Sequence, residues 1–99
     1  EVCEASGVGA EIDATAVPAL PGALELAASG KAEAGGSRRN AEDAERFTVW
    51  SQEVAPDRRA LLTDAMTSGG LLAAVPPGTS MDGTKVGTLV EGEPRIAVS

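Results

Sequence analysis

Residues 64–75 constrain the fold of this chain more than any other stretch. Two adjacent glycines, Gly69 and Gly70, follow a polar turn and lead directly into five apolar residues at 71–75. Paired glycines let the backbone turn with positive φ or let another group approach it closely. An apolar run of this length, flanked in this way, is typical of a strand buried on both faces. We therefore expect a core strand over residues 71–75, with a polar loop at its leading end.

The polar loop before this run has two interpretations. Thr67 and Ser68 offer two hydroxyls and several backbone N–H groups on one small surface, and such nests can hold anions. The simpler alternative, on spacing alone, is a tight turn that only leads into the strand. Asp64 precedes the turn, and we expect its carboxylate to accept hydrogen bonds from it.

A second polar loop is expected over residues 31–40. Gly35 and Gly36 give it conformational freedom. The run from Ser37 to Asn40 supplies two cations and two hydrogen-bonding side chains, which make this loop the best candidate for an anion contact in an acidic chain. The simpler alternative is a solvated turn whose arginines pair with the acidic residues at 42, 43 and 45, and exposed pairs of that kind contribute little to stability.

Composition limits both the core and the chemistry. The chain has 99 residues, which fits one domain, and Phe47 and Trp50 are its only aromatic residues. The core must therefore be built from Ala, Val, Leu and Ile, and we expect modest stability. With no histidine and one cysteine, Cys3, the chain cannot hold a Cys/His zinc site or a Ser-His-Asp triad. We expect Cys3 to be a plain helix cysteine, and Glu11 and Asp13 to be a solvated acidic face rather than a metal pair.

The charge and the beginning of the chain bear on its partners and location. A formal net charge of −7 argues against nonspecific nucleic-acid binding, which needs a basic surface. No stretch approaches the ~20 apolar residues of a membrane span. Glu1 and Glu4 lie where a signal peptide would be basic. We expect a cytoplasmic protein with no membrane or nucleic-acid partner, and the missing initiator Met suggests an internal piece of a longer chain.

Glycine and proline positions predict the other elements. Gly7 and Gly30 are expected to end two helices, Pro56 to begin a third, and Asn40 to cap a short helix through residue 45. We expect Leu24 and residues 26–28 to face inward, together with Leu61 and Leu62. The expected fold class is α+β, a mixed sheet with packed helices, of about five strands and three helices. The expected helices cover 1–6, 23–29 and 57–63, and the expected strands cover 8–12, 47–50, 71–75, 85–90 and 95–98.

Four blocks of the sequence together resemble a known family. They read GVGAEID at 7–13, LPGALELA at 20–27, GGSRRN at 35–40 and DAMTSGGLLAAV at 64–75. Their order and approximate spacing resemble the carboxy-terminal domain of selenophosphate synthetase (selenide, water dikinase). Ala65 and Met66 stand where the family has Pro and Gln. After residue 75 the family carries a helix, whereas this chain has a short polar loop at 79–84.

The resemblance implies a fold and an activity. The fold would be that of the carboxy-terminal domain in the aminoimidazole ribonucleotide synthetase superfamily, three-layer α/β/α with one helix shortened or absent, over residues 1–99. The full-length enzyme makes selenophosphate from selenide, ATP and water, releases AMP and phosphate, and depends on Mg²⁺. The family's reactive Cys or selenocysteine, its essential Lys and its nucleotide loop belong to the amino-terminal domain, so we expect no catalytic or metal-binding residue here and no ATP or Mg²⁺ bound by this chain alone.

In this interpretation the domain closes the nucleotide cleft of the amino-terminal domain, its partner in the same protein, and the full-length enzyme forms a homodimer. The residues expected to face the cleft and position phosphate are Thr67, Ser68, Gly69, Gly70, Gly36, Arg38 and Asn40. Two alternatives remain. The chain could come from another superfamily member, such as a thiamine-phosphate kinase or a hydrogenase-maturation enzyme, or it could be a non-catalytic interaction domain.

Overall fold

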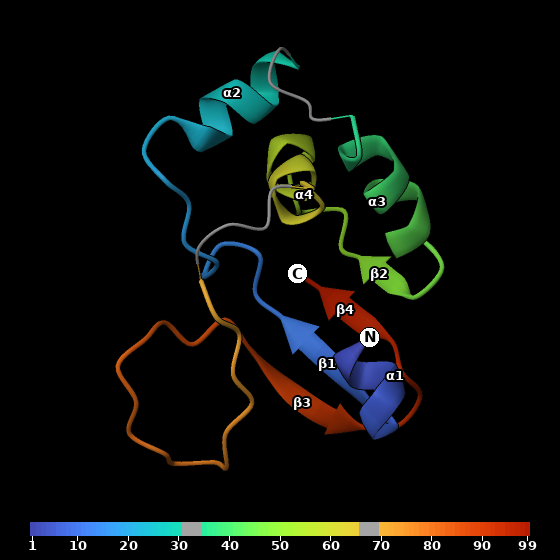
Figure 1. Ribbon diagram of the computed structural model, residues 1–99, viewed down its shortest axis with the longest axis vertical. Coiled ribbons are helices and arrows are strands. Elements are labelled where there is room, and N and C mark those ends of the chain that lie inside the picture. The colour runs from blue at the N-terminus through green and yellow to red at the C-terminus, as the bar shows by residue number, and fades with distance from the viewer. Residues whose placement is uncertain (31–34, 66–69) are drawn as a thin grey trace.

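The chain folds as an α+β unit around a mixed four-stranded sheet, which confirms the expected fold class (Figure 1). A computed structural model describes residues 1–30, 35–65 and 70–99. These residues contain four helices and four strands, where five strands and three helices were expected. The helices are α1 (Val2–Ser6), α2 (Ala23–Ser29), α3 (Ser37–Ala44) and α4 (Pro56–Leu62), and the strands are β1 (Val8–Ile12), β2 (Thr48–Trp50), β3 (Gly87–Glu91) and β4 (Ile96–Val98).

Glycine and proline set the helix boundaries as predicted. Gly7 ends α1 with φ 66°, and Gly30 ends α2 with φ 68°, in the left-handed conformation that glycine adopts at low cost. Pro56 lies in the first turn of α4, where its missing N–H has no helical partner to lose. No helix among the described residues is long and apolar enough to cross a membrane.

The sheet has the strand order β2-β4-β1-β3. Strand β1 pairs antiparallel with β3, from Val8 opposite Glu91 to Ile12 opposite Gly87. On its other side β1 pairs in parallel with β4, and β4 pairs in parallel with β2. Gly87 is needed at its position because a Cβ there would collide with the carbonyl oxygen of Glu11 and with Ile12. The sequence predicted all four of these strands to within two residues at each end.

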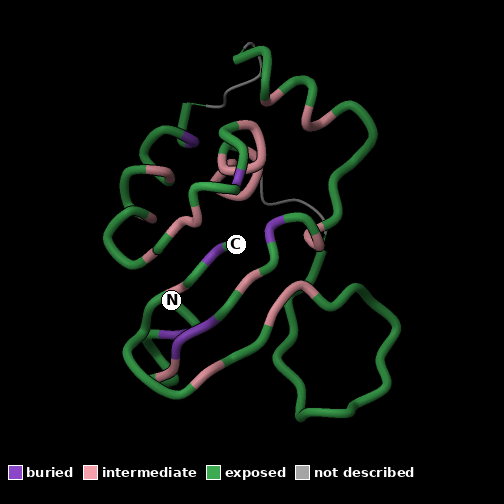
Figure 2. Tube along the Cα trace, turned by 180° about the vertical axis from the view of Figure 1, so that it is seen from behind, coloured by how far each residue is buried: buried purple, intermediate pink, exposed green. Residues whose placement is uncertain are grey.

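The core is small and is built from small side chains. Ala14, Val54 and Val98 form its buried centre, and partly buried side chains of Ile12, Trp50, Leu62 and Ile96 pack around it. Figure 2 shows how few positions are buried among the described residues. Burial alternates along strand β2, where Thr48 and Trp50 are partly buried and Val49 is exposed. Apart from Trp50, these core residues are Ala, Val, Leu and Ile, as composition predicted.

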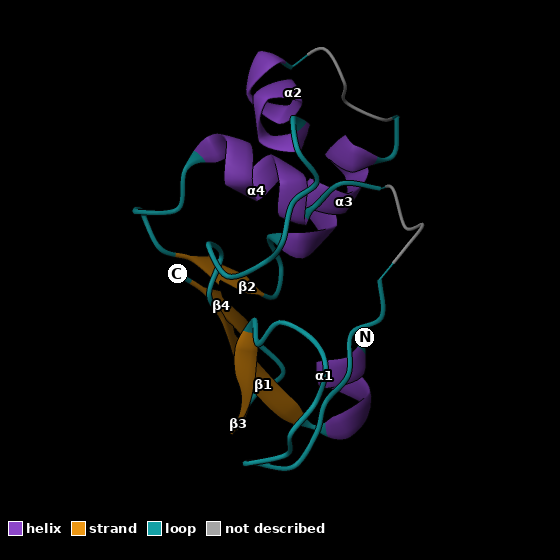
Figure 3. Ribbon diagram, turned by 90° about the vertical axis from the view of Figure 1, so that its left-hand side faces the viewer, coloured by secondary structure: helices purple, strands orange, loops and turns teal. Residues whose placement is uncertain are grey.

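The helices gather in two places. Figure 3 shows α2, α3 and α4 grouped above one end of the sheet, whereas α1 lies beside the other end. Helix α2 packs against α4, and α1 contacts β1. Arg59 of α4 joins this helix to the sheet: its Nη2 donates to the Ser51 carbonyl at 2.9 Å, and its guanidinium lies 5.3 Å from the centre of the Trp50 ring.

The strand expected over residues 71–75 is absent, and this prediction was wrong. Residues 70–76 have no regular secondary structure, and they belong to the open loop that precedes β3 in Figure 1. Leu71 is fully exposed and Leu72 is 80% exposed. An apolar run reports a preference for burial, but a strand also needs a neighbouring edge with free hydrogen-bonding groups. In the described sheet the place between β1 and β2 belongs to Ile96–Val98 instead.

Three smaller predictions were also wrong. Residues 37–40 are the first turn of α3 and not loop, and Asn40 lies inside the helix, donating its backbone N–H to the Gly36 carbonyl at 3.0 Å, so it caps nothing. Leu26 was expected to face inward but is 56% exposed, because the small sheet leaves α2 covered mainly by α4. Leu61 and Leu62 are partly buried, and Leu62 packs against the core, so it faces inward as predicted.

We predict that Val98→Ala will lower the free energy of unfolding by about 1–3 kcal/mol, because it removes methyl groups from the buried centre. Val98 is 5% exposed. Val49→Ala is the matched control, since Val49 lies on the neighbouring strand β2 and is 53% exposed. Urea unfolding of both variants measures the difference. Equal losses for the two variants would mean that β4 does not hold the central position.

Candidate functional site: two loops joined at Ser37 and Asp64

The structure describes four of the seven residues predicted to face the cleft. Gly36 immediately precedes α3, while Arg38 and Asn40 are exposed on its first turn. Gly70 is exposed, and a Cβ added to it would meet no atom of the described residues within 4 Å, so these residues give no steric reason for glycine there. Thr67, Ser68 and Gly69 lie outside the described residues.

Ser37 brings the two predicted loops together. Its hydroxyl donates to Oδ1 of Asp64 at 2.6 Å, and the backbone N–H of Ala65 donates to the same hydroxyl at 3.2 Å. Gly36 lies close to this contact, because a Cβ on it would lie 3.2 Å from the Cβ of Ala65. The blocks at 35–40 and 64–75, separated in the sequence, therefore meet in space.

Asp64 was predicted to accept hydrogen bonds from the turn that follows it, but residues 66–69 of that turn lie outside the described residues. The donor that the structure shows is the hydroxyl of Ser37, at the start of α3. The sequence identified Ser37 as a hydrogen-bonding side chain of the second loop, but Ser37 is not among the residues predicted to face the cleft. The available signal was a small hydroxyl residue beside a glycine pair. Nothing in the local pattern, however, identifies a bonding partner 27 residues away.

In the simpler alternative for this segment, the arginines at 38 and 39 would pair with the acidic residues at 42, 43 and 45. The described residues show no such pairs. In the described part of the chain, the acidic residue that forms an ion pair here is Asp43, and its partner is Arg46, at 3.3 Å. Arg38 and Arg39 form no ion pair with any described residue. Both residues are exposed.

The carboxylates at the end of β1 do not form a metal site with other described residues. No group of three or more His, Cys, Asp or Glu side chains comes together in the described ranges. Oδ1 of Asp13 accepts hydrogen bonds from the Thr15 hydroxyl at 2.8 Å and from the Thr15 backbone N–H at 3.0 Å. These bonds, the side-chain bond first, lower the pKa of Asp13 from its ordinary value of 3.8. Cys3 is a buried free thiol in α1.

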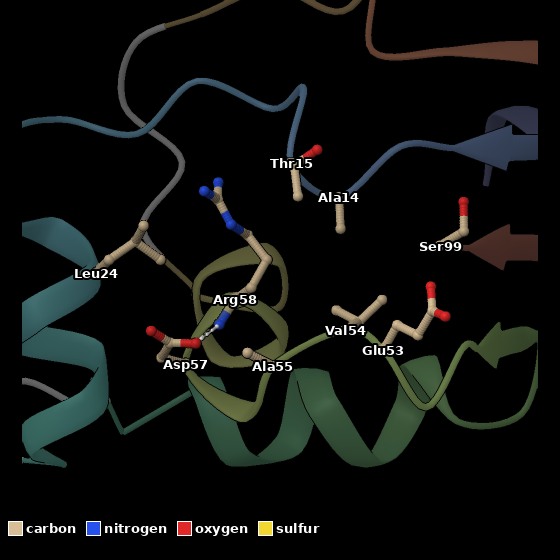
Figure 4. A pocket seen from close by; sticks show the side chains of 9 residues that line it. All are labelled: Ala14, Thr15, Leu24, Glu53, Val54, Ala55, Asp57, Arg58 and Ser99. Atoms are coloured by element: carbon tan, nitrogen blue, oxygen red, sulfur yellow. Dashed lines mark hydrogen bonds between the residues drawn. The ribbon is translucent and has the colours of Figure 1, made fainter.

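A shallow pocket of about 250 Å³ lies elsewhere, between the end of β1, α2 and the start of α4 (Figure 4). Arg58 lines it, but its Nη1 already donates to the Val17 carbonyl at 2.9 Å. None of the residues predicted to contact phosphate lines this pocket, so it is separate from the two joined loops. Its lining residues are Ala14, Thr15, Leu24, Glu53, Val54, Ala55, Asp57, Arg58 and Ser99.

We predict that Thr15→Val will raise the pKa of Asp13 toward 3.8 without fully restoring it, because the backbone N–H of Thr15 still donates. In the native chain the pKa is lower when folded than when unfolded. The ionised carboxylate therefore stabilises the fold above pH 3.8, and this contribution is lost as the pH falls through the lowered value. A carbon-13 NMR titration of Asp13 measures the shift. Thr84→Val should leave it unchanged, and an unaltered pKa in Thr15→Val would contradict the bonding described.

Comparison with curated proteins finds relatives that all bear the same name. No protein-family model matches the chain. Over 80 residues, 78% of this chain, it is 45% identical to a selenide, water dikinase of Cronobacter sakazakii, 41% identical to that of Escherichia coli strain K12 and 40% identical to that of Photobacterium profundum. The match spans 21% of the length of each of these relatives. Over most of its length, the chain is homologous to a segment of the selenide, water dikinases.

Proposed function

We propose that the chain is the carboxy-terminal unit of a selenide, water dikinase and closes the nucleotide cleft of that enzyme. The observation that carries this proposal is the identity of 40–45% over 80 residues to relatives that bear this name. The activity would be the one implied by the resemblance: selenide, ATP and water give selenophosphate, AMP and phosphate. Because the match covers about a fifth of each relative, this activity would belong to a longer protein.

The geometry of the joined loops supports a division of roles within this site. The Asp64 carboxylate lies beside Ser37 at the beginning of α3, and its negative charge disfavours a phosphate at that helix end. Arg38, in contrast, is exposed and forms no ion pair with a described residue. We therefore assign contact with phosphate to the guanidinium of Arg38. Asn40 lies two residues further along α3, on another face of the helix, so it would contact a different part of the cleft.

The remaining cleft-facing residues keep the roles that the resemblance implies. Backbone N–H groups of residues 67–70 would position phosphate or the mobile loop of the amino-terminal domain. As the resemblance implies, Mg²⁺ and ATP would be held by that domain, and neither would be bound by this chain alone. The full-length enzyme would be a cytoplasmic homodimer with the fold of the aminoimidazole ribonucleotide synthetase superfamily. The exposed leucines at 71 and 72 suit a unit that packs against a partner domain.

Replacing the matching segment of the Escherichia coli strain K12 dikinase with this chain tests the proposal. We expect the chimera to release AMP from ATP in a selenide-dependent reaction, with kcat/KM within about tenfold of the parent enzyme, a loss of ~1.4 kcal/mol in transition-state stabilisation. The parent enzyme and a version without the segment are the reference points. A chimera that folds and binds ATP but shows no selenide-dependent turnover would contradict the proposal.

Arg38→Ala in the same chimera tests the role of the cation. It should raise the KM for ATP several-fold, by roughly the 2–5-fold that loss of ~0.5–1 kcal/mol of binding produces. Arg46→Ala is the matched control, because Arg46 is equally an exposed arginine near α3 but pairs with Asp43. Equal effects of the two substitutions would show that general charge, and not the position of Arg38, matters.

A further inference from the structure

Ser37 is the first residue of α3, and its side chain is buried although the residues on either side of it are exposed. Ser37 is only 8% exposed, and among the described residues it is the one polar or charged residue that is buried. Its oxygen donates to Asp64 and accepts from the Ala65 N–H, so both kinds of hydrogen bond available to a hydroxyl are used. The bond to a carboxylate is short, at 2.6 Å, as expected when the acceptor is charged.

The two ends of this contact are fixed to different helices. On one side, the Gly36 carbonyl accepts from the Asn40 N–H within α3. On the other side, the Asp64 N–H donates to the Leu61 carbonyl at the end of α4. The close approach of Gly36 to Ala65 leaves little room for the two segments to slide past each other.

We propose that Ser37, Asp64 and Ala65 form a latch that sets the position of the Gly36–Arg38 segment relative to the end of α4. This inference rests on the proposed function and adds Ser37 and Asp64 to it as positioning residues, which act through the loops and touch no substrate. Because the latch ties the two segments together, it makes them move as one body when the domain closes. A change at one loop is then transmitted to the other.

The chemistry of the latch determines which substitutions test it. Ser37→Ala removes the donor and the acceptor at once and leaves a carboxylate and a backbone N–H without their partner. Ser37→Thr keeps the hydroxyl and serves as the conservative rescue. Asp64→Asn keeps an acceptor oxygen but removes the charge, so its effect should be smaller than that of Ser37→Ala.

The first measurement uses the 99-residue chain and does not depend on any activity. Amide hydrogen exchange of Ala65 is expected to accelerate about five- to tenfold in Ser37→Ala, the factor that corresponds to loss of one hydrogen bond, and less in Asp64→Asn. Ser37→Thr should restore slow exchange. Thr79→Val is the matched control, since the Thr79 hydroxyl bonds only locally, to the Pro76 carbonyl at 2.7 Å. Unchanged exchange of Ala65 in both Ser37→Ala and Asp64→Asn would overturn the latch.

The second measurement uses the chimeric dikinase described above. Ser37→Ala should lower kcat by about tenfold with a smaller change in the KM for ATP, because a misplaced loop impairs closure more than initial binding. Ser37→Thr should recover most of the kcat. If exchange of Ala65 accelerates but kcat does not change, the latch is structural only and the positioning role is overturned. An inactive unsubstituted chimera would contradict the proposed function, while the exchange experiment would still decide whether the latch exists.

Discussion

The described sheet depends on the hydrogen bonds that strand β4 makes on both of its sides. Toward β2, the Ile96 N–H donates to the Phe47 carbonyl at 2.8 Å, and the Val98 carbonyl accepts from the Ser51 N–H at 2.8 Å. Toward β1, the Arg95 carbonyl accepts from the Ala10 N–H at 2.9 Å. Among the described residues, strand β2 joins the sheet only through β4. The three residues of β4, Ile96–Val98, therefore connect β2 to the β1–β3 pair, and Val98 lies in the core.

Strand β4 is short and the core residues are small. Polar contacts are therefore important for holding the helices in place. Arg59 ties α4 to the carbonyls of Ser51 and Val54 and lies over Trp50. Arg58 reaches the Val17 carbonyl from the same helix. The bond between Ser37 and Asp64 then connects the end of α4 to α3. Helix α4 is therefore the element through which the sheet, the connector before α2 and the candidate site are joined.

The same contacts explain how charge is distributed at the candidate site. A carboxylate satisfied by a hydroxyl occupies the beginning of α3, so the helix end itself is a poor place for a second anion. The guanidinium groups of Arg38 and Arg39 remain exposed and make no ion pair with the described residues. The site thus combines a hydrogen bond that joins two segments of the chain with exposed arginines next to it.

The sequence by itself determined the features that depend on local conformation. Gly7, Gly30 and Pro56 predicted helix boundaries because backbone φ is a property of single residues. The sequence also predicted that Gly36 faces the cleft and that Asp64 accepts hydrogen bonds. Only the tertiary structure decided that Ile96–Val98 and not residues 71–75 would take the central strand, and that Ser37 would bond to Asp64. Strand pairing and long-range hydrogen bonds depend on which distant groups meet, and no local pattern in either segment contains that information.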